Sequence, residues 1–64
     1  MLSANIKKLR KQHHLSQEEL AKKAGITYST LIKIESGKNK NPTLETLTKI
    51  ANTFKIKIDE LVGK

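Results

Sequence analysis

Apolar residues recur along this chain at the three- and four-residue spacing of amphipathic helices. The clearest run covers residues 44–54, where the apolar positions are separated by three, three, one and three residues. Near the N-terminus, Ile6, Leu9 and His13 fall on one side of a second such helix. Residues 55–58 alternate like a strand, but no second strand is available to pair with them. The pattern therefore predicts an all-α chain.

Capping signals set the ends of five predicted helices. Ser16 and Glu19 have the spacing of a capping box, in which each side chain bonds the other residue's backbone N–H. Thr27 and Thr43 are placed to cap two later helices, and Gly25 stands where a left-handed residue ends a helix. We expect helices over residues 3–13, 17–24, 28–36, 44–54 and 58–62.

Length and composition allow one small domain, residues 1–64. The chain contains no cysteine, which excludes disulfides and thiolate metal sites. No apolar run approaches the roughly 20 residues that cross a bilayer, and the N-terminus lacks the apolar stretch of a signal peptide. We expect a mature, soluble, cytoplasmic protein.

Residues 15–37 have the arrangement of a helix-turn-helix. A short capped helix, a tight turn at Gly25, a second capped helix and a stop at Gly37 follow one another. Two short helices joined in this way meet at a steep angle. Ala21 is small where the helices would cross, and Ile26 is placed to fill the space between them.

Several segments resemble the lambda-repressor-like (XRE-type) helix-turn-helix family. The matching segments are LSQEELA at 15–21, AGIT at 24–27, IESGK at 34–38, PTLETL at 42–47 and DEL at 59–61. The resemblance extends over nearly the whole chain. The resemblance implies a compact five-helix bundle that binds operator DNA, commonly as a dimer.

The charge balance favours a polyanionic partner. Thirteen Lys and Arg residues oppose six Asp and Glu residues, a formal net charge of +7. The alternative is that a small protein simply keeps a solvated lysine-rich surface. For Lys7, Lys8 and Lys11 two interpretations stay open. These residues contact phosphates, or they form a solvated face of the first helix.

The N-terminal residues of the second helix of such a motif reach base edges in the major groove. We expect Tyr28, Ser29, Thr30 and Lys33 to read bases. Ser29 and Lys33 are one helical turn apart and point the same way. Lys33 is suited to donate to guanine, and Tyr28 either contacts a thymine methyl or a phosphate, or is a packing residue.

Phosphate contacts are expected to flank this helix. Gln17 stands at the start of the preceding helix, where free backbone N–H groups favour an anion, and the resemblance implies the same backbone-clamping role. The caps and the basic loop supply the further candidates Thr27, Lys38, Asn39 and Lys40.

Arg10 and Glu35 each lie beside an apolar stripe, where a charge needs a partner. In the family pattern an arginine of the first helix pairs with the glutamate of the Ile-Glu-Ser-Gly segment. The resemblance therefore implies an Arg10–Glu35 ion pair that braces the first helix against the third.

No catalytic or metal-binding pattern is visible. His13 and His14 are adjacent, so their side chains point apart on a helix, and no ligand-type residue lies near them in sequence. Ser16 is better explained as a cap than as a nucleophile activated by His14. We expect no enzyme activity, cofactor, metal ion or small-molecule ligand.

These observations favour a sequence-specific regulator of double-stranded DNA, a repressor of bacterial or phage origin that associates with the nucleoid. We expect a homodimer on a palindromic operator, paired through the C-terminal residues Phe54, Ile56, Ile58, Leu61 and Val62. The alternative is an antitoxin-like or cofactor-like protein-interaction module on the same fold. Binding to a membrane surface is a weaker hypothesis, because the capped turns indicate a compact domain.

Overall fold

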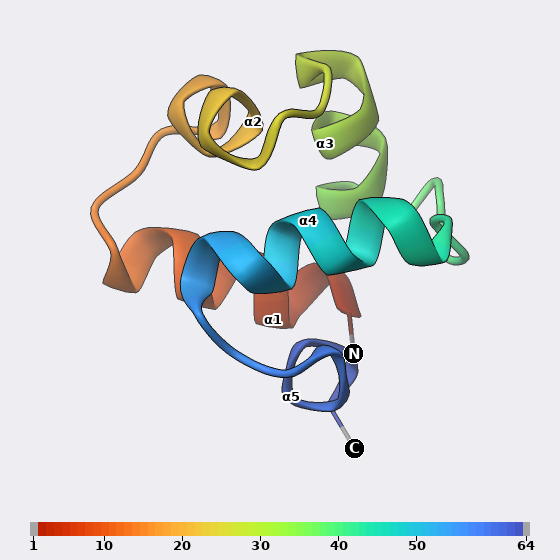
Figure 1. Cartoon of the computed structure of the whole chain (residues 1–64). Coiled ribbons are helices and arrows are strands. Elements are labelled where there is room, and N and C mark those ends of the chain that lie inside the picture. Colours follow the sequence, from red (N-terminus) through yellow and green to blue (C-terminus); the bar gives the residue numbers. More distant parts are fainter. Residues whose placement is uncertain (1, 64) are drawn as a thin grey trace.

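Five helices make up most of the chain in the computed structural model, which describes residues 2–63 (Figure 1). They are α1 (Leu2–Gln12), α2 (Gln17–Ala24), α3 (Tyr28–Glu35), α4 (Leu44–Phe54) and α5 (Ile58–Val62). Residues 2–63 contain no strand, and none of their helices has the length and apolar character of a membrane span. The all-α prediction is confirmed, with every helix end within one residue of its expected place.

The predicted caps hold the starts of three helices. At α2 the Ser16 hydroxyl accepts from the Glu19 backbone N–H at 3.0 Å, and the Glu19 carboxylate accepts from the Ser16 N–H at 2.9 Å. Thr27 caps α3 and Thr43 caps α4, each accepting a backbone N–H at 3.1 Å. These bonds satisfy N–H groups that have no partner inside the helix.

Besides α5, which Gly63 ends, three helices end on a residue in the left-handed conformation. Gly25 ends α2 with φ of 73°, as predicted, but His14 and Lys55 end α1 and α4 with φ of 57° each. The residue after each one closes the turn by donating its N–H five residues back, at 3.0 Å: Leu15 to Arg10, Ile26 to Ala21 and Ile56 to Ala51. This bonding pattern is the Schellman motif.

One hydrophobic core connects all five helices. Its buried members are Ile6, Leu20, Ala21, Ala24, Leu31, Ile34, Ile50, Ala51, Phe54 and Leu61. The prediction that Phe54 and Leu61 line a dimer surface is wrong, because they are 4% and 0% exposed. A domain of this size needs such large side chains for its own core. Ile56 and Ile58 pack half-buried against that core, and Val62 is half-buried.

The helix-turn-helix and the C-terminal helix lie on opposite sides of the molecule. Figure 1 shows α2 and α3 together on one side of α1 and α4, and α5 on the other. The Asn5 side-chain amide fastens α5 to α1 by donating to the Leu61 carbonyl at 3.1 Å. The exposed faces of α2 and α3 are therefore free of the C-terminal segment.

Candidate nucleic-acid interface

Helices α2 and α3 form the predicted helix-turn-helix. In Figure 1 α2 is seen along its axis while α3 runs across the view, so the two helices cross steeply. Ala21 is 3% exposed, and Ile26 packs against the core from the turn. The small Ala21 and the apolar Ile26 thus allow α3 to pack against α2, as their positions in the sequence predicted.

The outer face of α3 carries three of the four predicted base-reading side chains. Leu31 and Ile34 anchor the helix from its inner face and are 0% and 1% exposed. On the outer face Tyr28 is 45% exposed, and Ser29 and Lys33 are exposed. Because Leu31 and Ile34 fix its inner face in the core, α3 presents these three side chains to solvent from a defined position.

Thr30, the fourth predicted base reader, is engaged within the protein. Its hydroxyl accepts from the Thr27 hydroxyl at 2.7 Å, and its backbone N–H donates to the same Thr27 oxygen at 3.1 Å. Thr30 is half-buried. Both hydroxyls therefore stabilise the first turn of α3 in the protein without a ligand.

The predicted ion pair between α1 and α3 is present. Arg10 Nε lies 2.9 Å from Glu35 Oε2, and Arg10 Nη2 donates to Glu35 Oε1 at 3.1 Å. The Glu35 side chain is 1% exposed and that of Arg10 14%. Two parallel bonds of this kind fix orientation as well as distance.

Gln17 joins this ion pair, a contact that sequence reasoning missed. Its amide nitrogen donates to Glu35 Oε1 at 3.2 Å. The two residues are 18 positions apart, and no local pattern signals the contact. An amide nitrogen has two N–H donors, so Gln17 has one more donor to offer at the start of α2.

The basic loop follows α3 directly. Gly37 takes φ of 83° there, and the Asn39 backbone N–H donates to the Lys33 carbonyl at 3.0 Å. The Asn39 side-chain oxygen accepts from the Asn41 N–H at 3.1 Å and shapes the loop. The Asn39 amide nitrogen, which would donate to a phosphate, takes no part in that bond. Lys38 and Lys40 are exposed.

The lysines of α3 and of the loop after it form no ion pair within residues 2–63. Between residues 2 and 63 the ion pairs are Arg10–Glu35 and the exposed Lys49–Glu45 pair of α4, at 3.4 Å. Lys33 and the two loop lysines, Lys38 and Lys40, therefore keep their charges available to an anion.

One of the two histidines makes a packing contact. The His13 ring lies against Phe54 with ring centroids 5.0 Å apart. Across the described residues no group of three His, Asp or Glu side chains converges in a way that could hold a metal ion.

Comparison with known proteins relates nearly the whole chain to one family. The family model described as Helix-turn-helix matches residues 6–61. An HTH-type transcriptional regulator of Methanocaldococcus jannaschii is 45% identical over 56 residues, covering 88% of this chain and 83% of that protein. The phage CTXphi transcriptional repressor RstR of Vibrio cholerae is 39% identical over 98% of this chain. This chain spans 56% of RstR, and 29% of a 36% identical regulator from Coxiella burnetii.

Solved structures give the same relationship. The N-terminal DNA-binding domain of SinR from Bacillus subtilis superposes with a TM-score of 0.94 at 33% identity, over 100% of this chain and 93% of that one. A crystal structure of SinR in complex with DNA superposes with a TM-score of 0.92 at 34% identity, over 97% and 98%. The chain therefore belongs to the XRE-type helix-turn-helix family.

Proposed function

We propose that this chain is a sequence-specific DNA-binding transcriptional regulator that places α3 in the major groove. The observation that carries the proposal is the outer face of α3, where Tyr28, Ser29 and Lys33 are exposed above buried Leu31 and Ile34. The net charge of +7 and the similarity to named transcriptional regulators and to SinR, solved with DNA, support it. The similarity to the repressor RstR favours repression.

Base recognition falls to the three outward side chains. Lys33 donates to the O6 and N7 acceptors that guanine presents in the major groove. Ser29, one turn earlier, pairs with donors or acceptors of a neighbouring base, and Tyr28 contacts a thymine methyl or a phosphate at the groove edge. Thr30 accepts from the Thr27 hydroxyl and keeps its own O–H, with which it donates to a base or a phosphate.

Phosphate binding falls to residues on either side of α3. The free N–H of the Gln17 amide and the N-terminal end of α2 hold one phosphate, because unpaired backbone N–H groups and the helix dipole favour an anion there. Lys38 and Lys40 hold the backbone at the other end of α3. Such contacts set position and affinity but carry no base sequence.

Two copies are needed for a useful affinity. A single module of this kind buries roughly 600–1,000 Å² of protein surface on DNA. A homodimer on a palindromic operator doubles that surface, with the two α3 helices one DNA turn, about 34 Å, apart. We place this complex on the nucleoid, in the cytoplasm of a bacterium or on a phage operator.

Selection of bound sequences from random duplex DNA tests the proposal. We expect a palindromic consensus. Lys33→Ala should change the preferred base at one position of each half-site, whereas Gln17→Ala should weaken binding to all sequences evenly. Circular dichroism of both variants controls for folding. A folded protein that enriches no sequence, or two variants that both bind like the parent, would contradict the proposal.

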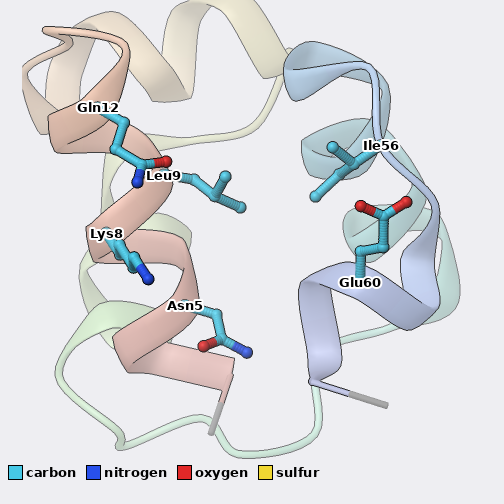
Figure 2. A pocket seen from close by; sticks show the side chains of 6 residues that line it. All are labelled: Asn5, Lys8, Leu9, Gln12, Ile56 and Glu60. Carbon is cyan, nitrogen blue, oxygen red and sulfur yellow. The ribbon is translucent and has the colours of Figure 1, made fainter.

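A hollow away from α2 and α3 favours a second candidate function, protein interaction. It has a volume of about 230 Å³ and lies between α1 and α5 (Figure 2). Figure 2 shows Leu9 and Ile56 pointing toward each other across it, with polar side chains around them: Asn5, Lys8, Gln12 and Glu60. An antitoxin-like or cofactor-like module would use this surface. That function gains support if selection enriches no DNA and the protein stays monomeric.

A further inference from the structure

Leu44 lies outside the core although its spacing places it on the apolar face of α4. It is 69% exposed and begins the helix directly after the Thr43 cap. Among the described residues the exposed large apolar side chains are Leu44 and Tyr28, and Tyr28 belongs to the proposed DNA face. A single exposed leucine needs no explanation by itself. An exposed leucine becomes a candidate contact when an apolar recess that can receive it lies nearby.

Such a recess lies between the start of α1 and the loop after α3. It is a hollow of about 250 Å³ whose lining is mainly apolar. Its walls are formed by Leu2, Ser3, Ile34, Gly37, Asn39 and Lys40. A Cβ built on Gly37 meets no atom within 4 Å, so the glycine leaves open space at this wall. The hollow is suited to receive one aliphatic side chain.

The exposed leucine follows, a short way along the chain, a residue that lines the hollow. Lys40 lines the hollow, and Leu44 follows it by four residues, which span at most about 14 Å. A projection beside a matching recess lets two identical surfaces pair about a two-fold axis, because each copy both gives and receives.

Charge supports the same pairing. Glu45 stands beside Leu44 with its side chain 79% exposed, and Lys40 stands beside the hollow. In such a pair the acidic Glu45 accompanies each Leu44 toward a hollow that is lined by a basic residue, Lys40. Within its own helix Glu45 lies 3.4 Å from Lys49 in an exposed pair, which costs little to rearrange. This acidic residue locally reduces the repulsion expected between two copies that each carry +7.

We propose that two copies of this chain pair through this face when they bind DNA, with Leu44 of each copy seated in the hollow of the other. The inference rests on the proposed function, since it names how the two copies on an operator contact each other. The face adjoins the C-terminal end of α3, whereas Tyr28 and Ser29 stand at its N-terminal end. Pairing therefore leaves Tyr28 and Ser29 free to contact bases.

The contact is too small to hold a dimer without DNA. Stable interfaces bury at least about 1,000 Å² in total, and one leucine with its neighbours on each side covers less. We expect a monomer in dilute solution and cooperative binding of two copies to a full palindromic site.

Binding of Leu44→Ser to a full site and to an isolated half-site tests the contact. We expect half-site affinity within about twofold of the parent and a loss of about tenfold in affinity for the full site, through lost cooperativity. Tyr28→Ser is the matched control, because it removes the other exposed large side chain and should weaken both sites alike. Unchanged full-site binding by Leu44→Ser would overturn the inference and leave the proposed function standing. An equal loss on both sites would also overturn it, because Leu44 would then contact DNA itself.

Cross-linking tests the pairing without relying on a DNA site. The chain has no cysteine, so Leu44→Cys protein mixed with Ser3→Cys protein carries one thiol on each partner. We expect a mixed disulfide at high protein concentration, and faster formation on the full site. Lys57→Cys replaces Leu44→Cys in the control mixture. Equal cross-linking in both mixtures would contradict the pairing, even if no operator were found.

Discussion

Arg10 and Glu35 join α1 to α3 through two parallel hydrogen bonds, from Nε to Oε2 at 2.9 Å and from Nη2 to Oε1 at 3.1 Å. The third guanidinium nitrogen, Nη1, donates to the Leu15 carbonyl at 2.9 Å, at the entry to α2. Gln17 adds a bond from the first residue of α2 to the same glutamate. One nearly buried charge pair therefore fixes both helices of the helix-turn-helix relative to α1.

Arg10→Ala should destabilise the fold strongly, because it leaves the Glu35 carboxylate buried without its cation. Breaking a buried pair in this way costs about 3–5 kcal/mol, which approaches the whole stability of a domain this small. Urea denaturation followed by circular dichroism measures the loss. The double variant Arg10→Met, Glu35→Leu is the control and should recover most of the stability, since no charge is left unpaired. A loss below about 1 kcal/mol for Arg10→Ala would show that solvent replaces the arginine.

Lys55→Gly should stabilise the protein, because Lys55 holds the left-handed conformation that α4 needs at its end. This conformation costs a residue with a Cβ about 1–2 kcal/mol, and glycine gives back about 0.5–1 kcal/mol of that through its greater freedom when unfolded. The expected net gain is about 0.5–1 kcal/mol, read from thermal unfolding.

Gly25→Ala is the matched control for this argument. The backbone at Gly25 has φ of 73°, and a Cβ there meets nothing within 4 Å, so the change isolates the backbone strain. We expect a loss of about 1 kcal/mol. If Lys55→Gly and Gly25→Ala changed the free energy of unfolding equally and in the same direction, backbone conformation would not be the cause of either effect.

The helices could be predicted from the sequence because their signals are local. Ser16 with Glu19, Thr27 and Thr43 each mark a helix start within four residues, and the hydrogen bonds they were expected to make are present. The Arg10–Glu35 pair was accessible through the family pattern, which records a long-range contact that periodicity alone does not.

Features that depend on tertiary packing were missed. His14 and Lys55 adopt the left-handed conformation without being glycine, because the turns they form are closed by packing and by backbone bonds. Phe54 was expected to contact a second copy of the chain. In the structure α5 folds back, and Phe54 is buried in the hydrophobic core. The Gln17–Glu35 bond depends on how α2 lies against α3, which no local pattern specifies.

Glu19 should make folding stability depend on pH at the acidic end. Its carboxylate accepts from the Ser16 backbone N–H at 2.9 Å, and this bond, with a smaller contribution from the Ser16 side chain, lowers the pKa of Glu19 below the ordinary value of 4.5. A lowered folded-state pKa contributes stability above pH 4.5 and loses it as pH falls through the folded value.

Urea midpoints measured at neutral pH and at successive acidic pH values test this. In Glu19→Gln the acidic decline should be shallower than in the parent, because glutamine keeps the capping bond but does not titrate. Glu18→Gln, at the exposed neighbouring position, removes the same charge and should retain the parent's decline. Identical pH profiles for Glu19→Gln and the parent would exclude this contribution.

Removal of Lys38 and Lys40 should reduce the salt dependence of DNA binding, because each neutralised phosphate releases counterions. The slope of log affinity against log salt concentration falls by about 0.9 for each phosphate contact, so the double variant Lys38→Ala, Lys40→Ala should have a slope smaller by about 2. Fluorescence anisotropy over a salt series measures it. Lys55→Asn with Lys57→Ala removes the same charge from the connector between α4 and α5, and asparagine tolerates the left-handed position. That control should keep the parent's slope, because its lysines lie outside α2, α3 and the loop that follows α3. Equal reductions in both variants would mean that DNA responds to the net charge of +7 and not to the loop after α3.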